Sequence, residues 1–293
     1  MNDDAPELQE LLALVTSEEP ADLERAQARA LSLGKGSPRA KVIAAMAYDR
    51  LRALAGRSQK FGTQAVLVDG ERRAWPIDGN TTDSERAKWS LAPLAKMREQ
   101  LADAPLIGKP PLRRLLRRVR AQLSADDVEQ RSYAIAEHGE QLLESCAITG
   151  TLAAYWPLPG EADPRPLARA IARRRGCKLA LPVVDGDDMV FREWRDDAEL
   201  CDAGFGTLGP SERAPECVPD VVLVPLIGWD FDGARLGQGR GYYDRKLAAL
   251  PPAHVVGVAF DCQWLPCVPT ERHDRRLAAV VTERGGLSFS PLP

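Results

Sequence analysis

The chain has 293 residues, of which 44% are hydrophobic and 28% charged, and its formal net charge at pH 7 is −3. This length favours about two domains, and the small net charge excludes a chain-wide basic surface for nucleic acid or anionic lipid. No apolar run approaches the roughly 18 residues that span a bilayer, and the N-terminal MNDDAPELQE is acidic where a secretory signal is basic. We therefore expect a cytoplasmic protein without nucleic-acid or membrane partners. Any basic site must be local.

Cysteine and histidine show no metal-binding spacing. The six cysteines form no C-x-x-C pair, and the three histidines do not flank them at the spacing of zinc ligands. We expect reduced, partly buried thiols rather than disulfides or a metal cluster.

The first hundred residues combine helical and hairpin patterns. Residues 21–33 and 38–55 are rich in alanine, leucine and arginine at helical spacing. QAVLVDGERRAWPI predicts two short strands that turn at Asp69-Gly70. Thr82-Asp83-Ser84-Glu85 is a capping-box pattern, which predicts a helix through about Gln100.

A domain boundary is predicted in DAPLIGKPP, residues 103–111, where prolines and a glycine interrupt two helical patterns. We assign residues 1–104 to a small α+β module of unknown function and residues 105–293 to a second, α/β domain. The first module contains Tyr48-Asp49-Arg50 and GlnLysPheGlyThrGln at 59–64, which together resemble an uncharacterised bacterial domain. Asp49, Arg50, Gln59 and Gln64 are interpreted as a structural hydrogen-bond network, with a polar site as the alternative.

Short apolar strands alternate with helices after residue 105. Helices are predicted over 112–122, from Ser124 to about Cys146, over 164–175 and around 242–250. Strands are predicted over 151–158, 178–184, 189–194, 220–227, 254–261 and 277–282. This alternation indicates a mostly parallel sheet flanked by helices, a Rossmann-like α/β fold.

Polar and glycine-rich segments follow three of these strands. They are residues 157–161, 228–241 and 261–274. In open parallel sheets, ligands bind beyond the carboxyl ends of the strands. We therefore expect these segments to meet in one binding site.

The string RLGQGRGYYDR, residues 235–245, carries the strongest chemical signal. Its glycines leave backbone N–H groups unshielded, and a helix beginning at Gly241 or Tyr242 would direct further N–H groups at the same anion. The arginines suit phosphate oxygens. The string is neither a P-loop nor a Rossmann fingerprint, because the G-K-[ST] ending and the third spaced glycine are absent. A plain strand-to-helix connection with solvated arginines is the alternative.

RLGQGRGYYDR, preceded by VPLIGWDFDG, resembles the signature of the 5-formyltetrahydrofolate cyclo-ligase family. Further segments resemble family motifs in the family's order over residues 106–285. They are Lys109-Pro-Pro-Leu-Arg113, Tyr155 to Asp163, LALPVV with MVFREW, Gly204-Phe205-Gly206 and His273-Asp274. The chain departs from the family pattern at Gly209, where a glutamate is usual, and at Ala278, where an aspartate is usual.

The resemblance implies a cyclo-ligase/CoA-transferase-like fold and the ATP- and Mg²⁺-dependent conversion of 5-formyltetrahydrofolate to 5,10-methenyltetrahydrofolate. The catalytic residues it implies are Lys109, Arg240 and Asp244. The ATP-binding residues are Lys109, Arg113, Arg235, Leu236, Gly237, Gln238, Gly239, Arg240, Gly241, Tyr242, Tyr243 and Asp244. The folate-binding residues are Trp156, Glu161, Gly239, Arg240, Gly241, Tyr242 and Tyr243. Asp244 and Asp274 are the Mg²⁺ candidates.

Two other functions remain open from the sequence. One is a sugar-phosphate isomerase or CoA-transferase that uses the same anion loop without ATP. The other is a non-catalytic nucleotide or folate sensor, which Gly209 and Ala278 favour. The sequence leaves the oligomeric state open between monomer and dimer, and it assigns the other arginines of RRLLRRVR, residues 113–120, to a solvated helix face.

Overall fold

A computed structural model describes residues 6–33, 37–144, 146, 148–186, 188–250, 253–290 and 292. The chain forms two compact units, which we treat separately. The first comprises Met1–Leu115 together with Leu265–Arg272, and the second comprises Leu116–Trp264 together with His273–Pro293. The return of residues 265–272 to the first unit is a feature that no sequence pattern indicated. The division of roles at residues 104 and 105 stays a prediction.

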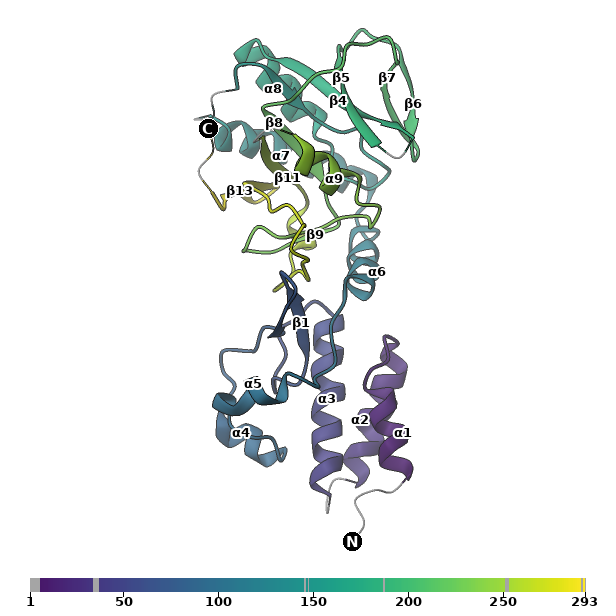
Figure 1. Ribbon diagram of the computed structural model, residues 1–293, viewed down its shortest axis with the longest axis vertical. Helices are drawn as coiled ribbons and strands as arrows, with labels where there is room; N and C mark the ends of the chain where they lie inside the picture. Colours follow the sequence, from purple (N-terminus) through teal and green to yellow (C-terminus); the bar gives the residue numbers. More distant parts are fainter. Residues whose placement is uncertain are drawn as a thin grey trace. The chain divides into compact units, whose positions relative to one another are not determined.

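Three helices form the core of the first unit (Figure 1). They are α1 (Pro6–Leu14), α2 (Pro20–Leu33) and α3 (Pro38–Leu54). Their contact is made largely by alanines, including Ala26 and Ala30 of α2 and Ala44 and Ala47 of α3. Small side chains let helix axes approach closely, which explains the alanine-rich sequence. α3 is capped by Ser37, whose side chain accepts a hydrogen bond from the Ala40 N–H.

The predicted hairpin is present, but the predicted helix that follows it is interrupted. β1 (Ala65–Val68) pairs with β2 (Glu71–Ala74) across Asp69 and Gly70, both at positive φ. Thr82 caps α4 (Asp83–Lys88) as expected. The prediction of a continuous helix to Gln100 is wrong, because α4 ends at Lys88 and Ser90 leaves the helical conformation with a φ of 58°, ahead of Pro93, which could not continue a helical hydrogen-bond ladder. A 3₁₀ turn (Leu94–Lys96) and α5 (Met97–Gln100) follow instead.

The interpretation of the N-terminal polar residues as a structural network is supported by their burial. The Asp49 carboxylate, 0% exposed, accepts hydrogen bonds from the N–H groups of Lys60, Phe61 and Thr63. Burial raises the pKa of Asp49, and these hydrogen bonds oppose that shift. The Gln59 and Gln64 side chains are fully buried, and Gln59 bonds to both backbone groups of Gln64.

Replacing Asp49 with Ala should lower the free energy of unfolding of the first unit by about 3 kcal/mol, because buried N–H donors lose their acceptor. Urea unfolding measures the loss, and hydrogen exchange at the amides of residues 60–63 should accelerate with it. Asp103→Ala, at an exposed position, is the control and should change stability by less than about 0.5 kcal/mol. Unchanged exchange at residues 60–63 would contradict the assigned role.

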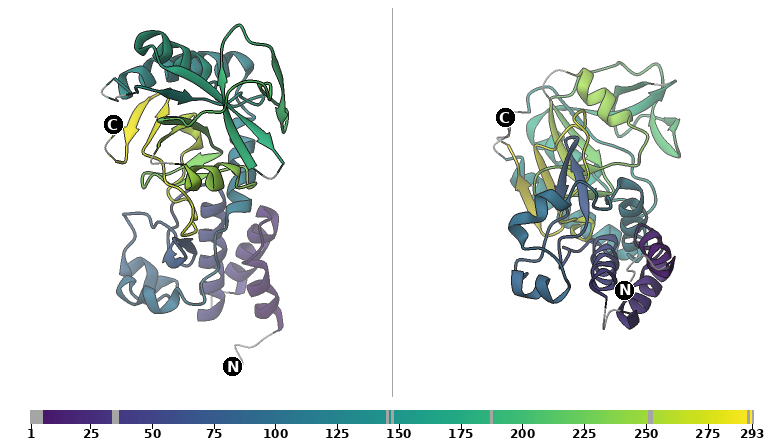
Figure 2. Two further views of the ribbon diagram at one scale, coloured as in Figure 1. Left: turned by 45° about the horizontal axis from the view of Figure 1, so that its top comes forward. Right: turned by 60° about the horizontal axis from the view of Figure 1, so that its bottom comes forward.

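A seven-stranded sheet organises the second unit (Figures 1 and 2). Its order is β13-β12-β11-β8-β3-β4-β5, and the strands from β12 to β4 run parallel. The strands are β3 (Thr151–Ala153), β4 (Lys178–Asp185), β5 (Asp188–Trp194), β8 (Val221–Pro225), β11 (His254–Val258), β12 (Ala279–Thr282) and β13 (Gly285–Ser288). The prediction of a mostly parallel sheet is confirmed. β13, which pairs antiparallel with β12, was not foreseen.

Helices cover both faces of this sheet. α7 (Ala125–Leu142) and α8 (Arg165–Arg175) pack on one face, where Leu152, Leu223 and Val256 point. α9 (Tyr242–Ala249) packs on the other through Leu247. α7 starts at the predicted Ser124–Asp127 capping box but ends at Leu142 rather than near Cys146. α6 (Lys109–Arg120) precedes it.

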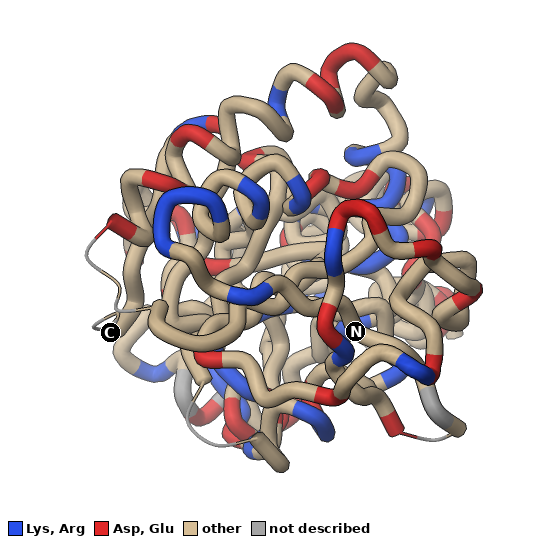
Figure 3. The backbone as a smooth tube through the Cα atoms, turned by 90° about the horizontal axis from the view of Figure 1, so that it is seen from above, with Lys and Arg blue, Asp and Glu red and all other residues tan. Residues whose placement is uncertain are grey.

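Two small antiparallel pairs stand apart from the main sheet. They are β6 (Leu200–Gly204) with β7 (Thr207–Pro210), and β9 (Gly228–Trp229) with β10 (Arg235–Leu236). Neither pair was predicted, because β6 and β7 do not alternate between buried and exposed residues and β9 and β10 have only two residues each. Along the backbone drawn in Figure 3, positions of Lys and Arg are mixed with positions of Asp and Glu. Among the described residues, no helix is long and apolar enough to cross a bilayer.

The cysteines are all free thiols. Burial raises the pKa of the Cys146, Cys177, Cys217 and Cys262 thiols. Raised thiol pKa values mean little thiolate at neutral pH, so these side chains behave as small apolar groups.

Candidate functional site

The sheet topology brings the predicted loops to one edge. β3, β8 and β11 are adjacent and parallel, so the segments that follow them leave from the same side. These segments contain Glu161 after β3, the glycine string after β8, and Asp261 after β11. The three segments therefore start at the same edge of the sheet, as the sequence predicted.

The glycine string adopts backbone shapes that favour glycine. Gly239 and Gly241 have φ values of 101° and 71°, which side chains with a Cβ rarely adopt. Gly241 is the N-cap of α9 and provides no side-chain hydrogen bond to the first turn. The first N–H groups of α9 are therefore not capped by a side chain, and they are suited to an anion.

A buried ion pair fixes the base of this loop. The Arg235 side chain is 4% exposed, and its guanidinium donates a hydrogen bond to Asp244 Oδ1. The second terminal nitrogen of Arg235, Nη1, is buried and has no hydrogen-bond partner within the part of the chain that the structure describes. Unpaired buried donors are costly, so Nη1 is a donor in need of an acceptor. Leu236, next in the chain, is fully buried.

Replacing Asp244 with Asn should destabilise the second unit by about 2 kcal/mol, because the buried Arg235 charge loses its counter-ion. Thermal or urea unfolding of the full chain would report this. Asp188→Asn is the matched control, since Asp188 pairs with Lys246 of the same helix at 3.9 Å but is 68% exposed. Equal stabilities for the two variants would mean that the Arg235–Asp244 pair contributes nothing.

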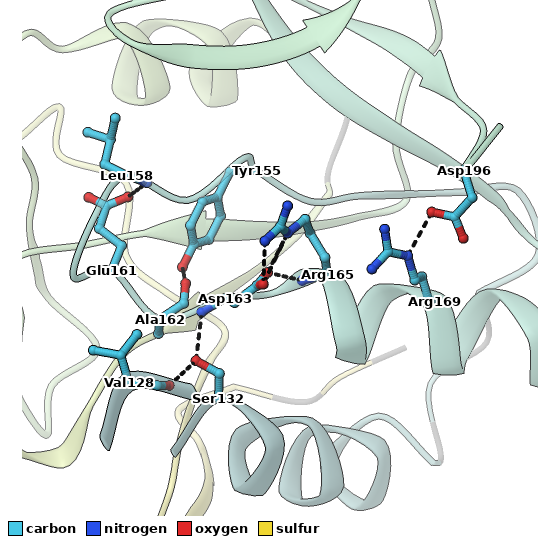
Figure 4. Close-up of polar contacts among 10 residues, drawn as sticks. All are labelled: Val128, Ser132, Tyr155, Leu158, Glu161, Ala162, Asp163, Arg165, Arg169 and Asp196. Carbon is cyan, nitrogen blue, oxygen red and sulfur yellow. Dashed lines mark hydrogen bonds and ion pairs between the residues drawn. The ribbon is translucent and has the colours of Figure 1, made fainter. Parts of the chain in front are cut away.

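Glu161 is a buried carboxylate held by groups from three segments. It is 6% exposed, and its Oε2 accepts a hydrogen bond from the Leu158 N–H at 3.1 Å (Figure 4). Its Oε1 accepts from Gln238 Nε2 at 3.1 Å and lies 3.6 Å from Arg120 Nη1. The predicted folate-binding carboxylate and the glycine string are thus in direct contact.

Two tyrosines lie near this carboxylate. Burial raises the pKa of the Tyr243 phenol, and the Glu161 charge raises it further. Burial also raises the pKa of Tyr155 well above its usual value, again with a contribution from Glu161. The Tyr155 hydroxyl donates to the Ala162 carbonyl at 2.6 Å, which fixes the loop that carries Glu161 (Figure 4). Both phenols are therefore neutral at physiological pH.

A cleft of about 620 Å³ opens beside Glu161. Its lining includes Trp156, Pro157 and Leu158 from the loop after β3, residues of α7, and Gly206 and Leu208 of the β6–β7 hairpin. The Arg165 guanidinium lies 4.1 Å above the Trp156 ring and also binds Asp163. Arg165 therefore covers one face of the Trp156 ring, and Trp156 also packs against the hydrophobic core of the second unit. The volume is in the range of small-molecule sites.

Aromatic contacts hold the outer part of the glycine string. Arg240 is exposed, and its guanidinium lies 3.8 Å from the ring centroid of Phe205. Phe205 also packs on Tyr242 with ring centroids 5.3 Å apart. Phe205 has a φ of 55° between two glycines at positive φ, so a strained hairpin tip presents its ring. The sequence placed Phe205 in a motif but assigned it no role.

Helix α6 carries two site residues that the sequence interpretation missed. Arg120, with a side chain 13% exposed, pairs with Glu161, and Arg117 Nη2 donates to Gln238 Oε1 at 3.0 Å. The assignment of these arginines to a solvated face is wrong for Arg120. Positions 113, 117 and 120 lie on one helix face, and this spacing was the available signal.

Lys109 and Arg113 belong to the first compact unit, in the first two turns of α6. Lys109 Nζ lies 3.2 Å from Glu271 Oε1 of the same unit. Arg113 is half-buried. Their predicted contact with a nucleotide stays a prediction.

The two Mg²⁺ candidates, Asp244 and Asp274, lie in different surroundings. Asp244 uses Oδ1 for Arg235 and is 27% exposed, whereas Asp274 is half-buried in the segment between β11 and β12. Among the described residues, no group of three or more His, Cys, Asp or Glu side chains could hold a metal ion. A cation here would need most of its ligands from substrate and water, as Mg²⁺ commonly does.

The Gly209 departure from the family pattern has a packing reason. A Cβ at Gly209 would lie 2.9 Å from the Ala203 Cβ and 3.1 Å from Val183. A glutamate at this position would require the hairpin to move away from β4. Ala278 precedes β12 at its amino end, and its N–H donates to the Val255 carbonyl, so it lies away from the carboxyl edge of the sheet.

This chain is similar to proteins of a known enzyme family. The model of the 5-formyltetrahydrofolate cyclo-ligase family matches residues 107–283. A 5-formyltetrahydrofolate cyclo-ligase of Escherichia coli (strain K12) is 33% identical over 141 residues, covering 45% of this chain and 77% of that protein. The Mycolicibacterium smegmatis cyclo-ligase is 32% identical over 160 residues, covering 50% and 80%. The solved structure of Aquifex aeolicus 5,10-methenyltetrahydrofolate synthetase superposes with a TM-score of 0.55 and 28% identity, covering 63% of this chain and 94% of that one.

Proposed function

The chain belongs to the 5-formyltetrahydrofolate cyclo-ligase family, and from this membership we propose that it converts 5-formyltetrahydrofolate to 5,10-methenyltetrahydrofolate with ATP and Mg²⁺, releasing ADP and phosphate. One observation on the site itself supports this proposal. The phosphate-type glycine string and the buried carboxylate Glu161 are joined by a 3.1 Å hydrogen bond, which is the proximity that a reaction between a nucleotide and a folate requires.

The chemistry explains why both substrates must meet. An amide carbonyl is a poor electrophile, and hydroxide is a poor leaving group. Transfer of the γ-phosphoryl group to the formyl oxygen forms an O–P bond and releases ADP. N10 then attacks the formyl carbon, the C–O bond breaks, and inorganic phosphate leaves with the oxygen and takes up the N10 proton. The protein must align these atoms and stabilise the charge on the moving phosphoryl group.

The glycine string has features suited to the nucleotide phosphates. Its N–H groups at the start of α9 and the buried Arg235 Nη1 are donors for phosphate oxygens. Arg240 is exposed on the Phe205 ring, and it would contribute positive charge after a small side-chain movement. Lys109 and Arg113 are retained as nucleotide ligands on the family motif alone. We propose residues 105–293 as the catalytic domain.

The residues present are compatible with Mg²⁺ bound mainly by phosphates and water. Mg²⁺ would neutralise charge on the β- and γ-phosphates. Asp244 Oδ2 would be its first protein ligand, because Oδ1 binds Arg235, and Asp274 is the second candidate. In this arrangement Arg235 orients the carboxylate and prevents it from rotating.

The pterin would bind in the cleft beside Glu161. An ionised carboxylate accepts strong hydrogen bonds from the amino and ring N–H groups of a pterin. Trp156 lines this cleft and would pack beside the pterin, and Tyr242 and Tyr243 would form the wall toward the nucleotide. Neutral Tyr243 is suited to donating a hydrogen bond rather than taking a proton.

Activity is tested with purified protein, 5-formyltetrahydrofolate, ATP and Mg²⁺, by following the methenyl chromophore and the ADP released. We expect one ADP for each methenyl product and loss of both signals after chelation of Mg²⁺. Tight binding of both ligands by calorimetry without product would favour the sensor. Failure to bind either ligand would favour the isomerase-like alternative.

Two substitutions should distinguish the folate site from the ATP site. Glu161→Gln should raise the KM for 5-formyltetrahydrofolate by at least about tenfold, because a charge-assisted hydrogen bond is lost. Arg240→Ala should instead raise the KM for ATP, with a smaller effect on folate. Steady-state kinetics on each substrate in turn measures both values. Glu161→Gln with an unchanged folate KM would refute the pterin assignment.

A further inference from the structure

The Gln238 side chain links three segments of the site. Its Nε2 donates to Glu161 Oε1 at 3.1 Å, and its Oε1 accepts from Arg117 Nη2 at 3.0 Å. Gln238 lies between Gly237 and Gly239 in the middle of the glycine string. One neutral amide therefore ties the nucleotide loop both to the buried carboxylate and to α6.

The acceptor capacity of Glu161 is limited. A carboxylate has about two lone-pair sites on each oxygen. Oε2 accepts one hydrogen bond, from the Leu158 N–H, whereas Oε1 is occupied by Gln238 and faces Arg120. A pterin that donates from its amino group and the adjacent ring N–H needs one open site on each oxygen. Oε2 offers one, whereas Gln238 takes one site on Oε1 and the Arg120 guanidinium, 3.6 Å away, stands at the other.

Of the two groups at Oε1, Gln238 can be displaced at the smaller cost in free energy. Arg120 is a charged side chain 13% exposed, and its removal would leave a buried charge without a counter-ion. Gln238 is neutral and exposed, so its amide regains hydrogen bonds from water. Gly239, at a φ of 101°, and Gly237, around which a Cβ would meet nothing within 4 Å, allow the loop to move.

We propose that Gln238 is a positioning residue that occupies the pterin's place on Glu161 in the folate-free protein. Folate binding displaces the amide and frees the nucleotide loop from Glu161. Gln238 thereby lowers folate affinity and couples the folate site to the loop that takes the phosphates. This inference rests on the proposed function, since it requires that Glu161 binds the pterin.

The experiment measures the Kd of 5-formyltetrahydrofolate by calorimetry without nucleotide. Gln238→Ala should bind the folate roughly three- to tenfold more tightly than the wild type, the range that one hydrogen bond of average net strength represents. Arg117→Ala, which removes the other anchor of Gln238, should tighten binding in the same direction. Gln122→Ala, at an exposed position near the end of α6, is the control and should leave the Kd unchanged.

A double-mutant cycle distinguishes competition at Glu161 from a general effect on loop structure. In the Glu161→Gln background, Gln238→Ala should no longer tighten folate binding by the wild-type factor. Equal tightening in both backgrounds, or no tightening in the wild-type background, overturns the inference. Absence of folate binding by the wild-type protein would instead refute the proposed function, so the two failures are distinguishable.

Discussion

The buried carboxylate of Glu161 is the constraint on which the candidate site depends. A charge that is 6% exposed is costly unless it is fully paired. Its partners are an N–H of its own loop, the amide of Gln238 and the guanidinium of Arg120. Because these groups come from the loop after β3, the glycine string and α6, one charge requirement holds three distant segments of the chain together.

The Arg235–Asp244 pair acts in a similar way at the base of the glycine string. Arg235 is buried on β10, and Asp244 lies in the first turn of α9, so the pair closes the loop between its two ends. The tip of the glycine string, in contrast to its buried base, consists of the exposed residues Gln238, Gly239 and Arg240. A fixed base with an exposed tip is suited to the phosphate-binding role that we propose for this loop.

The polar network of the first unit pairs buried backbone groups of its own loop. Asp49, Gln59 and Gln64 are fully buried, and they satisfy backbone groups of the loop over residues 59–64. A loop without regular secondary structure leaves many buried N–H and C=O groups unpaired, and polar side chains supply the missing partners. Conspicuous polar residues in a sequence therefore do not by themselves mark a functional site.

Local patterns in the sequence were sufficient for the strands of the parallel sheet, the Ser124 cap and the Asp69-Gly70 turn, because each depends on residues close together in the chain. They were insufficient for the end of α4 at Lys88, which helical spacing on both sides concealed, and for β6 and β7, whose residues do not alternate between buried and exposed. Arg120 and Glu161 are 41 positions apart in the sequence, and no local rule reaches that far.

The sequence by itself determined the fold class, the family and the glycine-rich backbone of residues 235–245, because periodicity, motif order and glycine spacing are properties of the linear chain. Only the tertiary structure decided which arginine of α6 neutralises Glu161, that Asp244 is held by Arg235, and that Gln238 occupies the carboxylate. These are choices among several chemically equivalent partners. They depend on which side chains come within hydrogen-bond distance after the helices and loops have packed.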